Sequence, residues 1–307
     1  MGNIVSSTAE SARSSAAQPA GDFELTPSVV LICVKYGSDG EAARYYGSLR
    51  QLQGQENLRV LVVDNTDDVA GTEPWVDSNF AFLRAQENLG YFGGARRGIS
   101  KYLEEHPLPD WVIVSNVDLL ITDPQFLQKL AALKTGPRVG AVAPRIASAL
   151  TGRNQNPFMR SRPSAMRMHL YKWLYRSWLA LNAHELASAV FHWSRSAVTQ
   201  VARTKANPSR DLSRKIYAPH GSFVVLSKEY FRVGGSLDFP CFLFGEEIYL
   251  AESLRMLGLD VIYEPSLEVV HQEHKSTKLL KSRKLARFVA SSAAYCADTY
   301  FPLKQAR

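Results

Sequence analysis

Short apolar runs recur along the first half of the chain, each followed by polar residues. The clearest is Ser28–Val34 (SVVLICV), whose continuous apolar character is typical of a strand buried on both faces of a parallel sheet. The same pattern predicts four further strands, at Arg59–Val63, Phe80–Ala85, Trp111–Ser115 and Val139–Ala143.

Helical periodicity separates these runs, at Glu41–Leu52, Gly94–Glu105 and Pro124–Leu133. The last segment follows Asp123-Pro124, which predicts an N-cap and a first helical residue. Because strands alternate with helices, we expect an α/β fold with a mostly parallel central sheet flanked by helices.

Composition limits the class of protein. The chain has 307 residues, of which 46% are hydrophobic and 21% charged, so it can bury a sizeable core and is not a disordered or fibrous chain. Its three cysteines form no C-x-x-C pair, which favours a reducing compartment over a disulfide framework or a cysteine zinc site. Residues 1–23 are rich in serine and alanine and are expected to be disordered, without a signal peptide. With no apolar stretch long enough for a transmembrane helix, we expect a cytoplasmic protein.

Positive charge is concentrated in two segments. Residues 151–215 carry 12 basic and two acidic side chains, and residues 275–307 carry eight basic and one acidic side chain. The net charge of the whole chain is +7, so the remaining residues are acidic on balance. This asymmetry predicts an anionic surface or substrate at one edge of the molecule.

Within the first basic segment, His169–Asn182 has the periodicity of one amphipathic helix. Its predicted apolar face comprises Leu170, Trp173, Leu174, Trp178 and Leu181. Such a helix either packs on the protein body or lies in a membrane interface, which would place the protein peripherally on the inner face of the cell membrane. The basic residues match no nucleic-acid-binding module, so no nucleic-acid partner is expected.

Five motifs follow one another along the chain. They are the apolar strand followed by Tyr36, VVDN at 62–65, ENLGYFGGARRG at 87–98, SNVD at 115–118, and a long run at 221–258 that contains FLFGEE and is followed by EVVH. In this order and spacing the sequence resembles the family 2 glycosyltransferases, and particularly their rhamnosyltransferase-like branch.

The resemblance implies the GT-A nucleotide-sugar transferase fold. The GT-A domain is expected over residues 24–274, with a basic helical insertion at 151–215 and a basic helical C-terminal tail at 275–307. An oligomer is compatible with the sequence.

Resemblance also implies which residues bind the nucleotide-sugar donor. A carboxylate at Asp64 can accept a hydrogen bond from a base N–H or a ribose hydroxyl, although an Asx-turn is the alternative. Arg96 stands where the family commonly has Asn, and either pairs with phosphate or lies on a solvated helix face. The expected donor-binding residues are Val34, Tyr36, Asp64, Asn88, Gly90, Gly94, Arg96 and Asn116.

A divalent cation, Mn²⁺ or Mg²⁺, is the implied cofactor. Asn116-Val117-Asp118 stands at the family's D-x-D-like motif, so Asp118 is the expected direct ligand and Asn116 its helper. Hard cations prefer such oxygen ligands and neutralise a departing diphosphate. His271 resembles the histidine that completes the metal site, with His274 as the alternative.

The FLFGEE motif resembles the family's catalytic "ED" motif at a helix start. Glu247 is the expected base and Glu246 its neighbour, and the alternative is that the two acids only complement the helix dipole. The expected acceptor-site residues are His220, Gly221 and Phe244, although His220 also fits a structural wall histidine.

These implications predict an inverting, metal-dependent glycosyltransferase. It would use a UDP- or dTDP-sugar, with dTDP-rhamnose as one candidate, and a saccharide or lipid-linked acceptor of bacterial surface polysaccharide synthesis. A non-catalytic nucleotide-sugar-binding scaffold of the same fold is the main alternative, because fold does not fix function. A sugar nucleotidyltransferase is less favoured, since Val34-Lys35-Tyr36-Gly37 contains no glycine-rich loop after the first strand.

Overall fold

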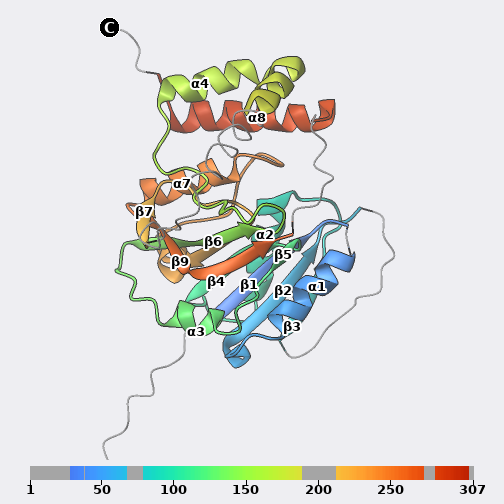
Figure 1. Ribbon diagram of the computed structural model, residues 1–307, viewed down its shortest axis with the longest axis vertical. Helices are drawn as coiled ribbons and strands as arrows, with labels where there is room; N and C mark the ends of the chain where they lie inside the picture. Colours follow the sequence, from blue (N-terminus) through green and yellow to red (C-terminus); the bar gives the residue numbers. More distant parts are fainter. Residues whose placement is uncertain (1–27, 38, 68–78, 189–211, 273–280, 304–307) are drawn as a thin grey trace, which may run out of the picture.

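The computed structural model describes residues 28–37, 39–67, 79–188, 212–272 and 281–303 (Figure 1). One nine-stranded sheet has the order β3-β2-β1-β4-β8-β6-β9-β5, and β7 pairs with β9. The strands are β1 (Val29–Lys35), β2 (Leu58–Asp64), β3 (Phe80–Arg84), β4 (Trp111–Asn116), β5 (Leu119–Leu120), β6 (Val139–Ser148), β7 (Arg214–Ile216), β8 (Phe223–Ser227) and β9 (Asp260–His271).

Helices cover both faces of this sheet, as Figure 1 shows. The labelled helices are α1 (Asp39–Leu49), α2 (Tyr91–Leu103), α3 (Phe126–Ala131), α4 (Ala165–Leu174), α6 (Lys228–Arg232), α7 (Glu246–Met256) and α8 (Arg283–Tyr300), together with a 3₁₀ turn at Gln55–Asn57. A further helical segment spans residues 178–188.

The parallel half of the sheet contains β3, β2, β1 and β4. Every residue of β1 is buried, because successive side chains point to opposite faces and both faces are covered. Val30 and Ile32 pack in one core with α2 and α7, whereas Leu31 and Cys33 pack in the other with α1 and α3. Burial on both faces explains why these strands are continuous apolar runs.

In the other half, β8 runs antiparallel between β4 and β6, while β9 runs parallel to β6. The predicted α/β class, with a mostly parallel central sheet flanked by helices, is confirmed. The five predicted strands are present, although β6 extends to Ser148. Helix α3 begins at Phe126, two residues later than predicted, and Asp123 accepts the N–H of Gln125 in the preceding turn.

The predicted single helix over His169–Asn182 is wrong. The chain leaves helical geometry after α4, and a second helix begins at residue 178, where the hydroxyl of Ser177 accepts the N–H of Ala180 as a cap. The second segment folds back along the first, since the ring of His184 contacts those of Tyr171 and Tyr175. We call residues 165–188 the helical hairpin.

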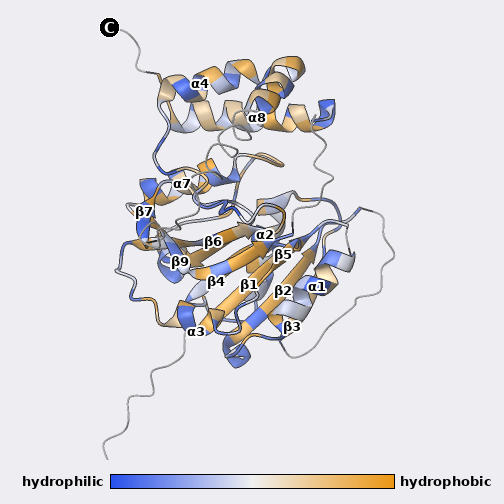
Figure 2. Ribbon diagram, viewed as in Figure 1, coloured by the Kyte–Doolittle hydropathy of each residue, from blue (hydrophilic) through white to orange (hydrophobic). Residues whose placement is uncertain are grey.

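The break divides the predicted apolar face. Leu181 is fully buried, whereas Leu170 and Trp173 are exposed to solvent. The hairpin packs on α8, so that it forms an outer layer above the sheet domain (Figures 1 and 2). Among the described residues, no helix is both long and apolar enough to cross a membrane.

Candidate active site

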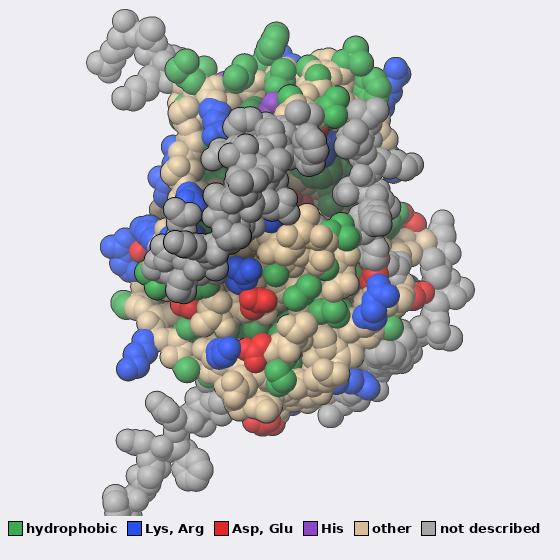
Figure 3. Space-filling view, in the orientation of Figure 1, with side chains coloured by type: hydrophobic (Ala, Val, Ile, Leu, Met, Phe, Trp, Pro, Cys, Tyr) green, Lys and Arg blue, Asp and Glu red, His purple; other side chains and the backbone are tan. Residues whose placement is uncertain are grey.

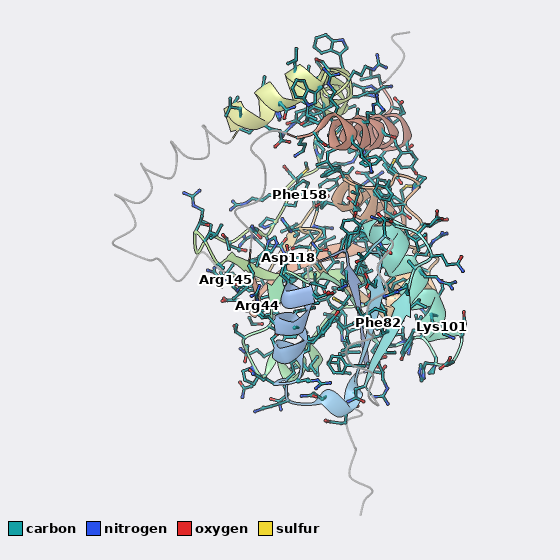
Figure 4. All side chains as sticks on the ribbon, turned by 90° about the vertical axis from the view of Figure 1, so that its right-hand side faces the viewer. Arg44, Phe82, Lys101, Asp118, Arg145 and Phe158 are labelled. Carbon is teal, nitrogen blue, oxygen red and sulfur yellow. The ribbon has the colours of Figure 1, made fainter. Side chains whose placement is uncertain are left out.

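A cavity of about 1070 Å³ opens at the carboxyl ends of β1 and β4. Its size suits a nucleotide-sugar-sized ligand. The start of α7, the end of β9 and the first turns of α8 complete its walls. Figure 4 shows Asp118 at this edge of the sheet, with Phe158 above it. Ligands of open α/β sheets bind at such strand ends.

Most of the predicted site residues line this cavity. They are Val34, Tyr36, Asn88, Gly90, Asn116, Asp118, His220, Gly221, Phe244, Glu246, Glu247 and His271. Asp64, Gly94 and Arg96 do not line it, and His274 lies outside the described residues.

Asp64 is buried in an ion pair instead of facing the cavity. Its Oδ2 accepts from the ammonium of Lys35 at 3.0 Å, and its Oδ1 accepts both the N–H and the hydroxyl of Thr66. Burial alone would raise the pKa of Asp64, but the hydrogen bonds from Thr66 and Lys35 hold it below its ordinary value. In the structure Asp64 therefore has the Asx-turn arrangement, with three hydrogen bonds from protein donors.

The turn that Asp64 organises brings two other side chains to the cavity. Asn65 and Asp67 both line it, and Asp67 accepts from the hydroxyl of Tyr36 at 3.3 Å. The amide nitrogen of Asn65 donates to the carbonyl of Gly90, while its buried Oδ1 has no hydrogen-bond partner among the described residues. Asn65 follows the predicted Asp64 in the VVDN motif. The motif therefore located this part of the site, but it did not indicate that Asn65 itself lines the cavity.

Two glycines of the ENLGYFGGARRG motif allow close packing. Gly90 has φ of 73°, and a Cβ there would lie 2.0 Å from the carbonyl oxygen of Phe242. A Cβ on Gly94 would lie 2.9 Å from both Val34 and Asn65. Gly94 therefore seats α2 against the strand ends and does not itself reach the cavity.

Arg96 points away from the cavity. Its guanidinium pairs with Asp238 at 2.9 Å, and both side chains are more than half exposed. Arg96 thus lies on a solvated helix face, in a salt bridge with Asp238. A surface pair of this kind contributes little to stability.

Asp118 and His271 meet at the cavity floor. The Nε2 of His271 lies 3.0 Å from Oδ2 of Asp118, and its Nδ1 lies 2.8 Å from Oε1 of Gln155. When Gln155 accepts the Nδ1 proton, the Nε2 lone pair faces the carboxylate, an arrangement that a shared cation would satisfy. The second carboxylate oxygen of Asp118, Oδ1, is buried and has no hydrogen-bond partner within the described part of the chain.

These donors fit a divalent cation. Asp118 Oδ1, which has no partner among the described residues, and the oriented imidazole of His271 would be two protein ligands, and Asn116 lines the cavity beside them. The described residues contain no group of three or more histidine, cysteine or acidic side chains that could hold an ion by themselves. An ion bound here would therefore need further oxygen ligands from phosphate or water.

Glu246 and Glu247 begin α7 and both line the cavity. Burial, and then the charge of Glu247, raises the pKa of Glu246 to about 8, and burial also raises the pKa of Glu247. Glu247 is the more exposed of the two. Its carboxylate lies against Gly221, whose backbone N–H favours the ionised form. Glu247 is thus the better placed to accept a proton from a ligand.

His220 is held by protein groups on two sides. Its backbone N–H donates to Asn156, and its Nδ1 is 2.9 Å from the hydroxyl of Ser222. Its ring lies edge-on to that of His271, with centroids 6.1 Å apart. His220 therefore forms part of the wall that supports the Asp118–His271 pair.

An apolar wall faces these polar groups. It comprises Phe242, Leu243, Phe244, Leu285 and Phe288. Phe244 has φ of 69°, unusual for a residue with a side chain, and the ring of Phe242 packs on that of Phe288 with centroids 4.8 Å apart. Leu285 and Phe288 carry no motif, so sequence reasoning missed them; only the packing of α8 brings them here.

Comparison with known proteins is consistent with this geometry. No protein-family model matches the chain. Over 285 residues it is 26% identical to N-acetylglucosaminyl-diphospho-decaprenol L-rhamnosyltransferase of Mycobacterium tuberculosis, covering 90% of this chain and 86% of that protein. The resemblance to rhamnosyltransferases is confirmed by this similarity.

Solved structures support the fold. The crystal structure of GalNAc-T7 with UDP, GalNAc and Mn²⁺ superposes with a TM-score of 0.51 at 9% identity, over 82% of this chain. The chain spans 45% of the length of that protein. At such low identity the likeness concerns the fold alone.

Proposed function

We propose that this chain, a glycosyltransferase of the GT-A fold that resembles the rhamnosyltransferase-like family 2 enzymes, is inverting and metal-dependent. It transfers a sugar from a nucleotide-diphosphate donor, dTDP-rhamnose being the first candidate, to a hydroxyl of a saccharide or lipid-linked acceptor. The reaction belongs to bacterial surface polysaccharide synthesis. The observation that carries this proposal is the convergence of Asp118, His271 and the Glu246–Glu247 pair on one cavity.

Each polar group has a distinct part in the proposed reaction. The carboxylate of Glu247, held by the N–H of Gly221, accepts the proton of the acceptor hydroxyl as its oxygen bonds to the anomeric carbon. The bond from that carbon to the diphosphate breaks on the opposite side, so configuration inverts. Asp118 and His271 hold the divalent cation, which when bound neutralises the charge that develops on the diphosphate.

Side chains at the strand ends bind the donor. Asp67, Asn65 and Tyr36 present acceptor and donor atoms along the cavity beyond β1 and β2. Carboxylate and amide oxygens suit base N–H groups and ribose hydroxyls. The M. tuberculosis relative acts, by its name, as an L-rhamnosyltransferase on a diphospho-decaprenol acceptor, and this supports a deoxysugar donor and a lipid-linked acceptor.

Calorimetric binding of UDP-, dTDP- and GDP-sugars tests the proposal, with Mn²⁺ and with EDTA. We expect the wild type to bind one nucleotide class only with metal, and Asp118→Ala to lose this binding by about a hundredfold or more, because it removes a ligand that bears charge. Asp238→Ala removes an exposed aspartate outside the cavity and should bind as the wild type does.

Transfer and binding are then separated by one further measurement. Metal-dependent release of free nucleotide diphosphate from the bound donor would indicate catalysis. Donor binding without any such turnover, even with a range of saccharide acceptors, would favour the scaffold alternative. Absence of binding to every donor would refute the assignment of Asp118 and His271 to a metal.

A further inference from the structure

Apolar side chains project from the outer side of the helical hairpin. On α4, Met166, Leu170 and Trp173 are 78%, 56% and 68% exposed. Their spacing of four and three residues places them on one helix face. Leu179 and Leu186 add to this surface from the second segment, and Leu179 is 70% exposed. We call these five residues the apolar ridge.

Figure 3 shows hydrophobic side chains gathered at the outer edge of the hairpin, with basic side chains beside them. A soluble surface scatters such residues singly, whereas a row of leucine, methionine and tryptophan on one face marks an interaction site. The ridge does not pack on the core, since the hairpin buries other residues, such as Met168 and Leu181, toward the protein.

The charge around the ridge favours an anionic partner. Residues 160–188 and 281–301 carry nine basic and two acidic side chains. Both acids are already paired within the hairpin–α8 layer, Asp298 with Lys172 and Glu185 with Lys281. Arg160, Arg167, Arg176, Arg283, Lys284 and Arg287 are all exposed. Apolar side chains surrounded by unopposed cations are typical of helices that lie in the headgroup region of an anionic bilayer.

Helix α8 connects the ridge to the cavity. On one side it carries the hairpin, through Lys172 to Asp298 and through the indole of Trp178, which donates to the carbonyl of Lys281. On the other side Lys284, Leu285 and Phe288 line the cavity. Two helical layers, the hairpin and α8, therefore separate the ridge from the cavity, a thickness of roughly 20 Å.

We infer that the apolar ridge and its basic surround dock this enzyme on an anionic lipid bilayer, with the cavity behind the hairpin and α8 on the side of the sheet domain that faces the bilayer. The docking itself does not depend on the proposed function. Its purpose, to bring a lipid-linked acceptor to the cavity, rests on that function. Met166, Leu170, Trp173 and Leu179 insert among the headgroups, while the exposed arginines and Lys284 contact lipid phosphates. Lys284 reaches both the cavity and this surface, so it is placed where the phosphates of a lipid-linked acceptor would enter.

Co-sedimentation with vesicles tests the inference on the full chain, using phosphatidylcholine alone and phosphatidylcholine with phosphatidylglycerol. We expect binding to the anionic vesicles that weakens as salt is raised, because counterions screen the basic surround. Leu170→Ser/Trp173→Ser should weaken partitioning by about tenfold or more, since both side chains lose apolar contact with lipid. Leu103→Ser removes an exposed leucine of α2 and should sediment as the wild type does.

Three outcomes would overturn the inference. The wild type could remain in the supernatant with anionic vesicles. The double variant could sediment as fully as the wild type. A concentration-dependent dimer, abolished by the same double variant in sedimentation velocity runs without lipid, would instead show that the ridge binds a second copy of the chain.

Different variants should remove lipid binding and donor binding, so the two properties can be tested separately. Asp118→Ala should sediment with vesicles normally, because it lies in the cavity. Leu170→Ser/Trp173→Ser should keep metal-dependent donor binding and transfer to a short soluble acceptor, yet transfer less to an acceptor embedded in vesicles. Normal melting of the double variant excludes misfolding as the cause.

Discussion

On the side of the cavity formed by the ends of β1, β2 and β4, polar side chains are fixed by hydrogen bonds, whereas the side formed by residues 242–244 and α8 is apolar. The polar side contains the Lys35–Asp64 ion pair, the Asn65 amide on Gly90 and the Asp118–His271 pair. Lys35 and Asp64 end the largely buried strands β1 and β2, Asn65 and Asp118 follow β2 and β4, and His271 ends β9, so their positions are set by the sheet.

The apolar side depends on a loop and a helix from distant parts of the chain. Phe244 is held at positive φ next to Gly245, and the ammonium of Lys281 lies 5.5 Å from its ring centroid. Ser292 of α8 donates to the carbonyl of Leu243, which ties the loop to the helix. This side is thus positioned by packing between separate elements rather than by one sheet.

The difference matches the two proposed substrates. A nucleotide diphosphate has fixed polar atoms, and rigid strand ends can meet them with preset hydrogen-bonding groups. An acceptor that carries a lipid has a large apolar part, and aromatic side chains on a loop and a helix can cover it. Glu247 and Gly221 lie where the two sides meet, which is where the proposed transfer occurs.

Removing the base at this junction should have the largest catalytic effect. Glu247→Gln keeps the shape of the side chain but cannot accept a proton, so we expect kcat to fall by about 10²–10⁴-fold with donor binding nearly unchanged. Glu56→Gln, which changes an exposed glutamate far from the cavity, is the matched control. If Glu246→Gln lost more activity than Glu247→Gln, the assignment of the base would be reversed.

A smaller effect, on metal binding, is expected from replacing Gln155 on the polar side of the cavity. Because its Oε1 lies 2.8 Å from Nδ1 of His271, it orients the imidazole toward Asp118. Gln155→Ala should weaken Mn²⁺ binding by about 10–100-fold, as loss of such a supporting group does in other metal sites. Metal titration followed by electron paramagnetic resonance measures this without turnover.

A conservative replacement separates orientation from folding. Gln155→Glu retains an oxygen acceptor for Nδ1 and should recover most of the Mn²⁺ affinity. Gln128→Ala, on the exposed face of α3, should leave the affinity unchanged. Equal Mn²⁺ affinity in Gln155→Ala and the wild type would mean that His271 needs no such support or is not a ligand.

Sequence patterns predicted the sheet side of the molecule well. Buried parallel strands must be continuous apolar runs, so five of the nine strands could be located along the chain, and their polar ends pointed to the cavity. The same reading could not distinguish Asp64 from Asp67. Whether a carboxylate of this turn faces the cavity or an internal cation depends on Lys35, whose ammonium donates to Asp64.

The apolar side was predicted less well, because its parts interact only through tertiary packing. Leu285 and Phe288 belong to a helix that lacks any catalytic motif. Periodicity also failed to predict the break in the helical hairpin. The helical pattern of apolar residues continues through Ser177, but the hydroxyl of Ser177 caps a new helix. In both cases the deciding contacts join residues far apart in the sequence.

The smallest expected effect concerns how the cavity protonates. Folding raises the pKa of Glu246 from its ordinary 4.5 to about 8, first through burial and then through the charge of Glu247. Between these two values the folded protein binds more protons than the unfolded chain, so stability falls as pH rises across this window. Glu246→Gln removes this loss. Its melting temperature should therefore rise relative to that of the wild type as pH increases from about 5 to about 8, by roughly 1.5 °C for each kcal/mol recovered.

The same variant should leave the acid limb of the pH dependence of catalysis nearly unchanged. Glu246, with its pKa raised to about 8 by burial and by the charge of Glu247, stays protonated while Glu247 ionises, so a neutral glutamine in its place removes no charge at that stage. The acid limb of kcat/KM should therefore stay where it is in Glu246→Gln, with activity above this limb within about tenfold of the wild type. Glu56→Gln should show neither the growing stability gap nor any shift of the limb. A limb that moved to higher pH would mean that Glu246 helps Glu247 to ionise, for example by donating a hydrogen bond, and that the two carboxyl groups act as one proton-sharing unit rather than as a base beside a buried acid.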